Sequence, residues 1–376
     1  MTQEGSFEDL TDDSPLFYRG IQFTLASLPD KKTVYTDEDV QTFARYMTDY
    51  MQTPEGLSLC QQILILTPPP TTAQQALTIP VVVDASLFQG QNDQTRGFYR
   101  GGYLVLKEMI GIPLGVLHHE GVHRVQGQKY AGIFDYENYA NLFDYFRCQL
   151  YVEAQAHLKE SSFQKNLPAD WPVPVPKSDL SFGGIWTMHH NMYPSLSPLD
   201  IQKRTNDTYL GRLMIPGEWA QIYQGNFLND IKKMMPSEDH PLGKVMFFLG
   251  DKGTEFLNSM RAELTQIGVM SDTLAELDRK AAELTMQALP LQQGILTDWE
   301  GVHTAIIDSM IMPPSVTPQN KPILKKMLTM LKKIKKTKRI HQETMEHLSQ
   351  EYGVPPVRVA KSKDNFENNS KGKTLK

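Results

Sequence analysis

The chain has 376 residues, of which 40% are hydrophobic and 22% charged, and it contains only two cysteines. This length allows two domains, or one large domain with additions, and the hydrophobic content is sufficient for a packed core. Two cysteines exclude a disulfide framework and fit a reducing compartment. The acidic N-terminus lacks the basic and apolar regions of a signal peptide, and no stretch reaches the roughly 18 consecutive apolar residues of a membrane span. We therefore expect a cytoplasmic protein by default. Export by a route that does not use an N-terminal signal is left open.

The net charge of −5 is unevenly distributed along the chain. Residues 321–376 carry 15 Lys and Arg against 5 Asp and Glu, whereas the preceding residues carry 23 against 38. The sequence therefore predicts a basic appendage on an acidic body.

The first half of the chain alternates helical and strand patterns. Helices are predicted over residues 37–51 and 54–66, and a buried strand over residues 79–83. Residues 98–107 are predicted as a second strand, bent or bulged at Gly101-Gly102. This mixture indicates an α+β fold for the region, which follows a disordered segment at residues 1–15.

Residues 116–126, VLHHEGVHRVQ, contain an HExxH motif formed by His119, Glu120 and His123. Two histidines four residues apart share one face of a helix, so their imidazole nitrogens can converge on one metal ion. Glu120 lies on the neighbouring flank, where it could take a proton from metal-bound water. The alternative is a surface helix whose two histidines happen to be four residues apart.

A catalytic tetrahedral metal needs one more protein ligand, and Glu153 is the best candidate. A long helical pattern covers residues 136–163, and in it Glu153 falls on the same face as Leu142, Phe146 and Leu150. A carboxylate on a buried face is costly unless it is paired or bound to a metal. Glu153 could instead pair with an Arg or Lys, or lie at the edge of the apolar stripe. His157, one turn later, is the reserve ligand.

HExxH with Gln126, followed by a helix with Glu153-Ala154-Gln155-Ala156, resembles the gluzincin type of zinc metallopeptidase and is similar to an uncharacterised bacterial metallopeptidase family. The resemblance covers roughly residues 80–160 and implies Zn²⁺ bound by His119, His123 and Glu153, with Glu120 as the general base. It also implies a zincin-like fold with a small sheet, in which residues 103–107 could form a sheet edge that pairs with an extended peptide. An internal strand without a ligand is the alternative for these residues. Gly121 and Arg124 depart from the stricter motif.

Helical patterns dominate after a Pro-rich connector at residues 164–177. One apolar stripe contains Leu257, Met260, Leu264 and Ile267, and another contains Leu274, Leu277, Ala281, Leu284 and Ala288. Thr273 with Glu276, and Thr297 with Glu300, have the spacing of capping boxes. Candidate donors for an oxyanion are His189, His190, Tyr209 and His303, and the sequence does not choose among them.

Residues 313–322 end the globular part of the chain. A basic amphipathic helix is predicted to follow. Residues 321–340 place apolar side chains on one face and lysines on the other, which suits an anionic membrane surface or an acidic partner. The helix could equally pack its apolar side on the acidic body. The chain gives no strong nucleic-acid signal, and residues 360–376 are expected to be disordered.

These observations predict a mostly helical α+β protein. Its expected parts are a zincin-like catalytic domain at residues 16–163, a helical C-terminal subdomain at 178–312 and a basic tail at 313–376. The expected function is zinc-dependent hydrolysis of peptide bonds. Two alternatives are a catalytically inactive zincin-like protein that binds metal or peptide, and an interaction protein that acts through its basic tail.

Overall fold

The structure is a computed structural model, and it describes nine parts of the chain: residues 17–18, 21–67, 77–88, 97–108, 114–166, 182–214, 225, 252–311 and 316–357. The segments expected to be disordered, 1–15 and 360–376, lie outside the described residues. Pro113, whose type and place just before the motif are typical of the first residue of a helix, also lies outside them.

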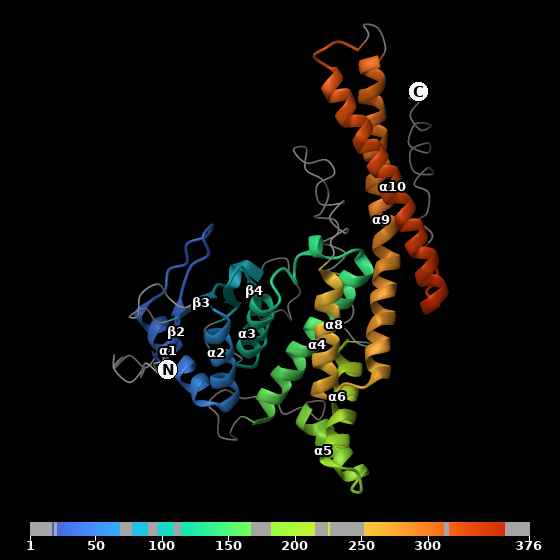
Figure 1. The fold of residues 1–376 in the computed structure, drawn as a ribbon. Coiled ribbons are helices and arrows are strands. Elements are labelled where there is room, and N and C mark those ends of the chain that lie inside the picture. Colours follow the sequence, from blue (N-terminus) through green and yellow to red (C-terminus); the bar gives the residue numbers. More distant parts are fainter. Residues whose placement is uncertain are drawn as a thin grey trace, which may run out of the picture.

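A small mixed sheet forms one end of the molecule (Figure 1). Its strands are β1 (Phe17–Tyr18), β2 (Ile21–Leu25), β3 (Leu77–Val83), β4 (Gly97–Arg100) and β5 (Tyr103–Leu106), in the spatial order β1-β2-β3-β5-β4. β2, β3 and β5 run parallel, and β1 and β4 are antiparallel to their neighbours. The predicted strand at residues 79–83 is confirmed as β3.

The two faces of the sheet are covered differently. Alternate strand residues, such as Ile79, Val81 and Leu104, enter a core with helices α1 (Asp37–Gln52), α2 (Pro54–Leu66) and α3 (Leu114–Lys129). The residues between them, such as Val82 and Val105, face the short helix η2 (Ala85–Phe88). This alternation follows from the two-residue period of a strand. The predicted helices at residues 37–51 and 54–66 are confirmed as α1 and α2.

Residues 98–107 form a hairpin rather than one bent strand. Gly101 and Gly102 have φ angles of 55° and 92°, the left-handed backbone that a two-residue hairpin turn requires. The turn folds β4 back on β5, so β5 is paired on both sides with β3 and β4. The expectation that residues 103–107 form the sheet edge is therefore wrong, and the edge strand next to α3 is β4.

Helix α4 (Leu142–Asn166) follows a short 3-10 helix, η3 (Tyr136–Asn138). The predicted helix at 136–163 therefore begins later, at Leu142, because Asn141 accepts a hydrogen bond from the Asp144 backbone and stops the helix from extending backwards. It also ends later, so residues 164–166 of the expected connector are helical. The rest of that connector lies outside the described residues.

Helix α4 packs against α3 on one side and against the C-terminal helices on the other (Figure 1). The C-terminal helices are α5 (Phe182–Met192), α6 (Pro198–Met214), α8 (Gly253–Ile267), α9 (Ser271–Ile311) and α10 (Lys321–Tyr352). Both predicted apolar stripes are confirmed: they lie in α8 and α9 and enter one hydrophobic core with α4.

Both predicted capping boxes are wrong, because Thr273 and Thr297 lie inside the long helix α9. Thr297 donates its hydroxyl to the Gln293 carbonyl one turn earlier, as a threonine within a helix does. Helix α10 runs back along α9 and forms a helical hairpin with it (Figure 1).

The architecture is α+β and mostly helical, as expected from the sequence. Among the described helices, none combines the length and the hydropathy needed to cross a membrane.

Candidate metal centre

Helix α3 is buried on nearly all sides, between the sheet, α2 and α4. Its buried residues include His118, His119, Glu120, His123 and Gln126. Gly121 is explained by the contact with α2, because a Cβ at this position would lie 2.5 Å from Leu59 Cδ2. The glycine that departs from the stricter motif is therefore what lets the two helices approach.

Three side-chain atoms converge where α3 meets α4. His119 Nε2 lies 2.9 Å from His123 Nε2, and Glu153 Oε2 lies 3.5 Å from the first nitrogen and 3.4 Å from the second. The helices run antiparallel, since His119 contacts Glu160 near the end of α4 whereas Gln126 contacts Val152 earlier in it. The structure thus brings together the three residues that the sequence singled out.

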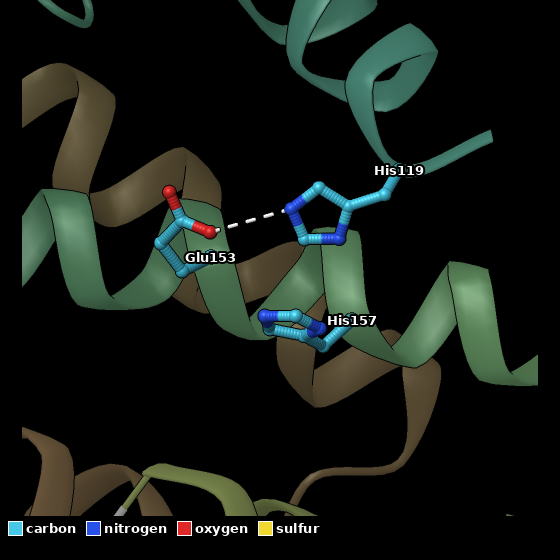
Figure 2. A group of neighbouring side chains, drawn as sticks. All are labelled: His119, Glu153 and His157. Atoms are coloured by element: carbon cyan, nitrogen blue, oxygen red, sulfur yellow. Dashed lines mark ion pairs between the residues drawn. The ribbon is translucent and has the colours of Figure 1, made fainter. Parts of the chain in front are cut away.

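The spacing of these atoms suits a small cation. Bonds of about 2.0–2.1 Å place tetrahedral ligand atoms about 3.3–3.4 Å apart, close to the observed 2.9–3.5 Å. The reserve ligand His157 also lies here: His119, Glu153 and His157 each offer an atom within 4.8 Å of the others (Figure 2). In the set with His123 no two of the three atoms are more than 3.5 Å apart, so His119, His123 and Glu153 are the stronger candidate ligands.

Glu160, which the sequence analysis did not single out, orients two of the histidines. Its Oε2 lies 3.1 Å from His119 Nδ1 and 3.2 Å from His157 Nδ1. A carboxylate at Nδ1 holds the proton there and leaves Nε2 free as a ligand. Glu153, His157 and Glu160 lie four and three residues apart on one face of α4, and this spacing is the signal that could have revealed Glu160.

His123 is held in the same way by an amide network. Its Nδ1 lies 2.8 Å from Gln126 Oε1, and Gln126 Nε2 donates to Gln155 Oε1 at 2.7 Å. Gln155 in turn donates to Glu263 on α8, which also accepts from Lys129. Gln126 of the motif thus links the second histidine to the C-terminal helices.

The electrostatics of the cluster favour positive charge. Burial alone would lower the pKa of His119, but Glu153 and Glu160 raise it well above its usual range. Burial would also lower the pKa of His123, but the attraction of the Glu153 carboxylate raises it. Burial would raise the pKa of Glu153, yet the two histidines hold it well below its usual range. The buried carboxylates therefore stabilise a proton or a cation among these atoms.

Glu120 lies beside the ligand triad, against the edge strand. It is only 6% exposed, and burial raises its pKa. A Cβ added to Gly97 of β4 would lie 3.2 Å from Glu120 Cγ. Arg124, one turn later, donates to the Gly102 carbonyl at 2.7 Å and ties the turn of the β4–β5 hairpin to α3. The second departure from the stricter motif therefore has a structural role.

The four candidate oxyanion donors are dispersed. His189 contacts Thr208, His190 stacks on Trp186, and His303 packs on Trp299, all in the C-terminal helices. Tyr209 on α6 is nearer the cluster: burial raises its pKa, and the Glu160 carboxylate raises it further.

Comparison of this chain with protein-family models, with curated proteins and with solved structures finds no match. The case for function therefore rests on the geometry of the site.

Proposed function

We propose that this protein is a zinc-dependent metallopeptidase that uses His119, His123 and Glu153 to hold the metal. The observation that carries the proposal is the convergence of two imidazole nitrogens and one carboxylate oxygen within 2.9–3.5 Å of one another. Two histidines and one glutamate form a ligand set of catalytic zinc, because they leave a position for water.

When bound, zinc would supply a Lewis acid that makes its water nucleophilic near neutral pH. Glu120 would act as the general base that takes the proton from the attacking water and passes it to the leaving amine. Because Glu120 is buried and its pKa is raised, it would take up and release a proton more readily than a permanently ionised carboxylate. Glu160 and Gln126 would fix the ring orientations of His119 and His123.

The edge strand β4 supplies a means of holding an extended peptide. Its outer edge is unpaired within the described sheet, and the strand runs past Glu120. Backbone groups at such an edge can add a peptide as a further strand. Phe134, 37% exposed and 6.0 Å from the His123 ring, would contact a substrate side chain beside the metal.

The metal content of the purified protein tests the ligand set. We expect about one zinc per chain by elemental analysis, and most of it lost in Glu153→Ala, because only two ligands then stay in place. Glu343→Ala is the matched control, since that side chain is 63% exposed on α10 and should leave the zinc content unchanged. Absence of zinc from the wild-type protein after reconstitution would contradict the site.

Cleavage of a broad peptide library, read by mass spectrometry, tests the general base. We expect Glu120→Gln to keep its zinc but to lose activity by about 100-fold or more, since general-base catalysis contributes at least that much. A variant that cleaves as fast as the wild type would remove Glu120 from the mechanism.

The near-complete burial of Glu120 favours one second candidate, a zincin-like protein that binds metal or peptide without turnover. This candidate predicts stoichiometric zinc and no cleavage of any library member by the wild-type protein.

A further inference from the structure

The far part of the α9–α10 hairpin extends away from the sheet and from the metal centre (Figure 1). We define the distal hairpin as residues 291–311 of α9 and 321–340 of α10. A small apolar cluster of Leu296, Ile334, Trp299 and Met330 holds its two helices together. The base of α10 is anchored separately, because Met345 and Leu348 enter the main core.

One face of the distal hairpin is strongly basic. Between residues 321 and 339, α10 carries nine Lys and Arg and no Asp or Glu. Six of them fall within about 100° of the helix surface, opposite the face that packs on α9. These six residues are all exposed: Lys321, Lys325, Lys332, Lys335, Lys336 and Arg339. At 1.5 Å per residue this face is about 27 Å long.

Little of this charge is neutralised within the described residues. Lys338 pairs with Glu300 of α9, and Arg339 lies 3.4 Å from Glu343. In the part of the chain that the structure describes, Lys325, Lys332 and Lys336 have no ion pair, although the body of the protein is acidic. Most of the charge on this face is therefore exposed to solvent and not neutralised by the described residues.

Exposed aliphatic side chains lie at the tip of the same hairpin. Ile311 and Val316, on either side of the connection between the helices, are 52% and 44% exposed. Ile323 is 46% exposed, and Leu328, which lies within the lysine face, is 43% exposed. Exposed aliphatic groups beside lysines are what an interfacial helix inserts among lipid head groups.

We propose that the distal hairpin docks the protein on an anionic lipid surface. Eight of its nine cationic residues between 321 and 339 are lysines and none of its residues there is aromatic, so this face lacks the stacking rings that bind single-stranded nucleic acid and has only one arginine for reading base edges. A phosphate backbone also offers no partner for Leu328, which lies within the lysine face. Lipid phosphates and acyl chains together match both features of the surface.

Sedimentation of the full-length protein with vesicles tests this proposal. We expect binding to vesicles that contain phosphatidylcholine and phosphatidylserine in equal amounts, and none to phosphatidylcholine alone. High salt should release most of the protein, because the attraction acts within a Debye length. Failure of the wild-type protein to bind the anionic vesicles overturns the proposal.

Paired variants locate the surface. Lys332→Gln with Lys336→Gln should weaken the vesicle partition coefficient by at least about tenfold, because each lysine near an anionic surface contributes about fivefold. The charge-matched control is Lys32→Gln with Lys252→Gln, two exposed lysines outside the hairpin, which should bind as the wild type does. Equal weakening in both pairs, or in neither, contradicts docking through this face.

Two further measurements separate the alternatives. Leu328→Ser should weaken vesicle binding at low and at high salt, since it removes an inserted group rather than a charge. Binding to a DNA or RNA duplex, or to poly-glutamate, without binding to anionic vesicles would overturn the lipid proposal. Glu153→Ala should bind vesicles normally, so this result does not depend on the metallopeptidase proposal.

Discussion

Glu160 is the residue outside the proposed ligand set that we expect to affect metal affinity most. Its carboxylate lies within 3.2 Å of two histidine Nδ1 atoms. It is not one of the three proposed ligands. Replacing it with alanine would leave His119 free to rotate and to change its tautomer. Loss of such a partner costs about 10–100-fold in metal affinity.

We therefore expect Glu160→Ala to bind zinc about 10–100-fold more weakly in a competition titration against a chromophoric chelator. Glu160→Gln, which keeps a hydrogen-bond acceptor, should bind with intermediate affinity. Glu255→Ala, an exposed glutamate on α8, should match the wild type. Equal affinities for the wild type and both Glu160 variants would show that the histidines are held by other contacts.

At this scale the sequence predicted the three side chains that the structure brings together, His119, His123 and Glu153, and missed residues that support them. HExxH is a local pattern, and Glu153 was recognisable because a carboxylate interrupts an apolar stripe. Glu160 was missed although it follows Glu153 and His157 at helical spacing on the same face of α4. The link from Gln126 to Gln155 and Glu263 joins three helices, so no local spacing could reveal it.

The contact between β4 and α3 determines how closely the sheet edge approaches Glu120. A Cβ at Gly97 would lie 2.6 Å from Val116 Cγ1 and 3.2 Å from Glu120 Cγ. Any side chain here must move the strand, Val116 or Glu120. Overpacking of this kind costs about 1–3 kcal/mol.

Gly97→Ala should therefore lower the free energy of unfolding by about 1–3 kcal/mol, measured by urea titration, and reduce peptide cleavage while zinc stays bound. Gly294→Ala is the contrasting control, because a Cβ at that position of α9 meets nothing within 4 Å. It should raise stability by up to about 1 kcal/mol, as Ala replaces Gly within a helix. A neutral Gly97→Ala would show that β4 does not constrain Glu120.

Among the elements, those determined by local patterns were predicted and those determined by distant partners were not. Helices α1 and α2 match their predicted spans to within one residue, since capping residues such as Thr36 and Thr53 mark their starts. The β4–β5 hairpin is the exception, because Gly101-Gly102 is itself a local signal for a two-residue turn and was interpreted as a bend within one strand. The apparent capping boxes failed because α9 begins at Ser271, before Thr273, and continues through Thr297, where it packs on α10.

At the scale of the whole molecule, α9 packs on α4, which carries Glu153, and continues into the distal hairpin. Asp278 of α9 pairs with Arg147 of α4 at 2.9 Å and with Arg261 of α8 at 3.0 Å. The sequence left open whether the basic helix packs on the body or faces an external partner. The structure shows that its apolar side packs on α9, and its lysines face outward.

The interface between α9 and α10 also contains a buried histidine that affects acid stability. His341 is 5% exposed, and its Nδ1 has no hydrogen-bond partner among the described residues. Burial lowers its pKa to about 4, compared with about 6.5 in an unfolded chain. The unfolded state therefore binds the proton first as the pH falls, and stability is lost as the pH drops from 6.5 toward 4.

This one group should remove about 2 kcal/mol from the free energy of unfolding between pH 7.5 and pH 5. His341→Leu should abolish that part of the acid sensitivity, and at neutral pH it should be at least as stable, since an unpaired buried nitrogen is lost. Gln342→Leu, which replaces an exposed, non-titrating side chain on the same helix, should keep the pH dependence of the wild type. Urea unfolding followed by circular dichroism at both pH values measures all three proteins. If His341→Leu loses as much stability on acidification as the wild type, protonation of His341 does not contribute to acid unfolding.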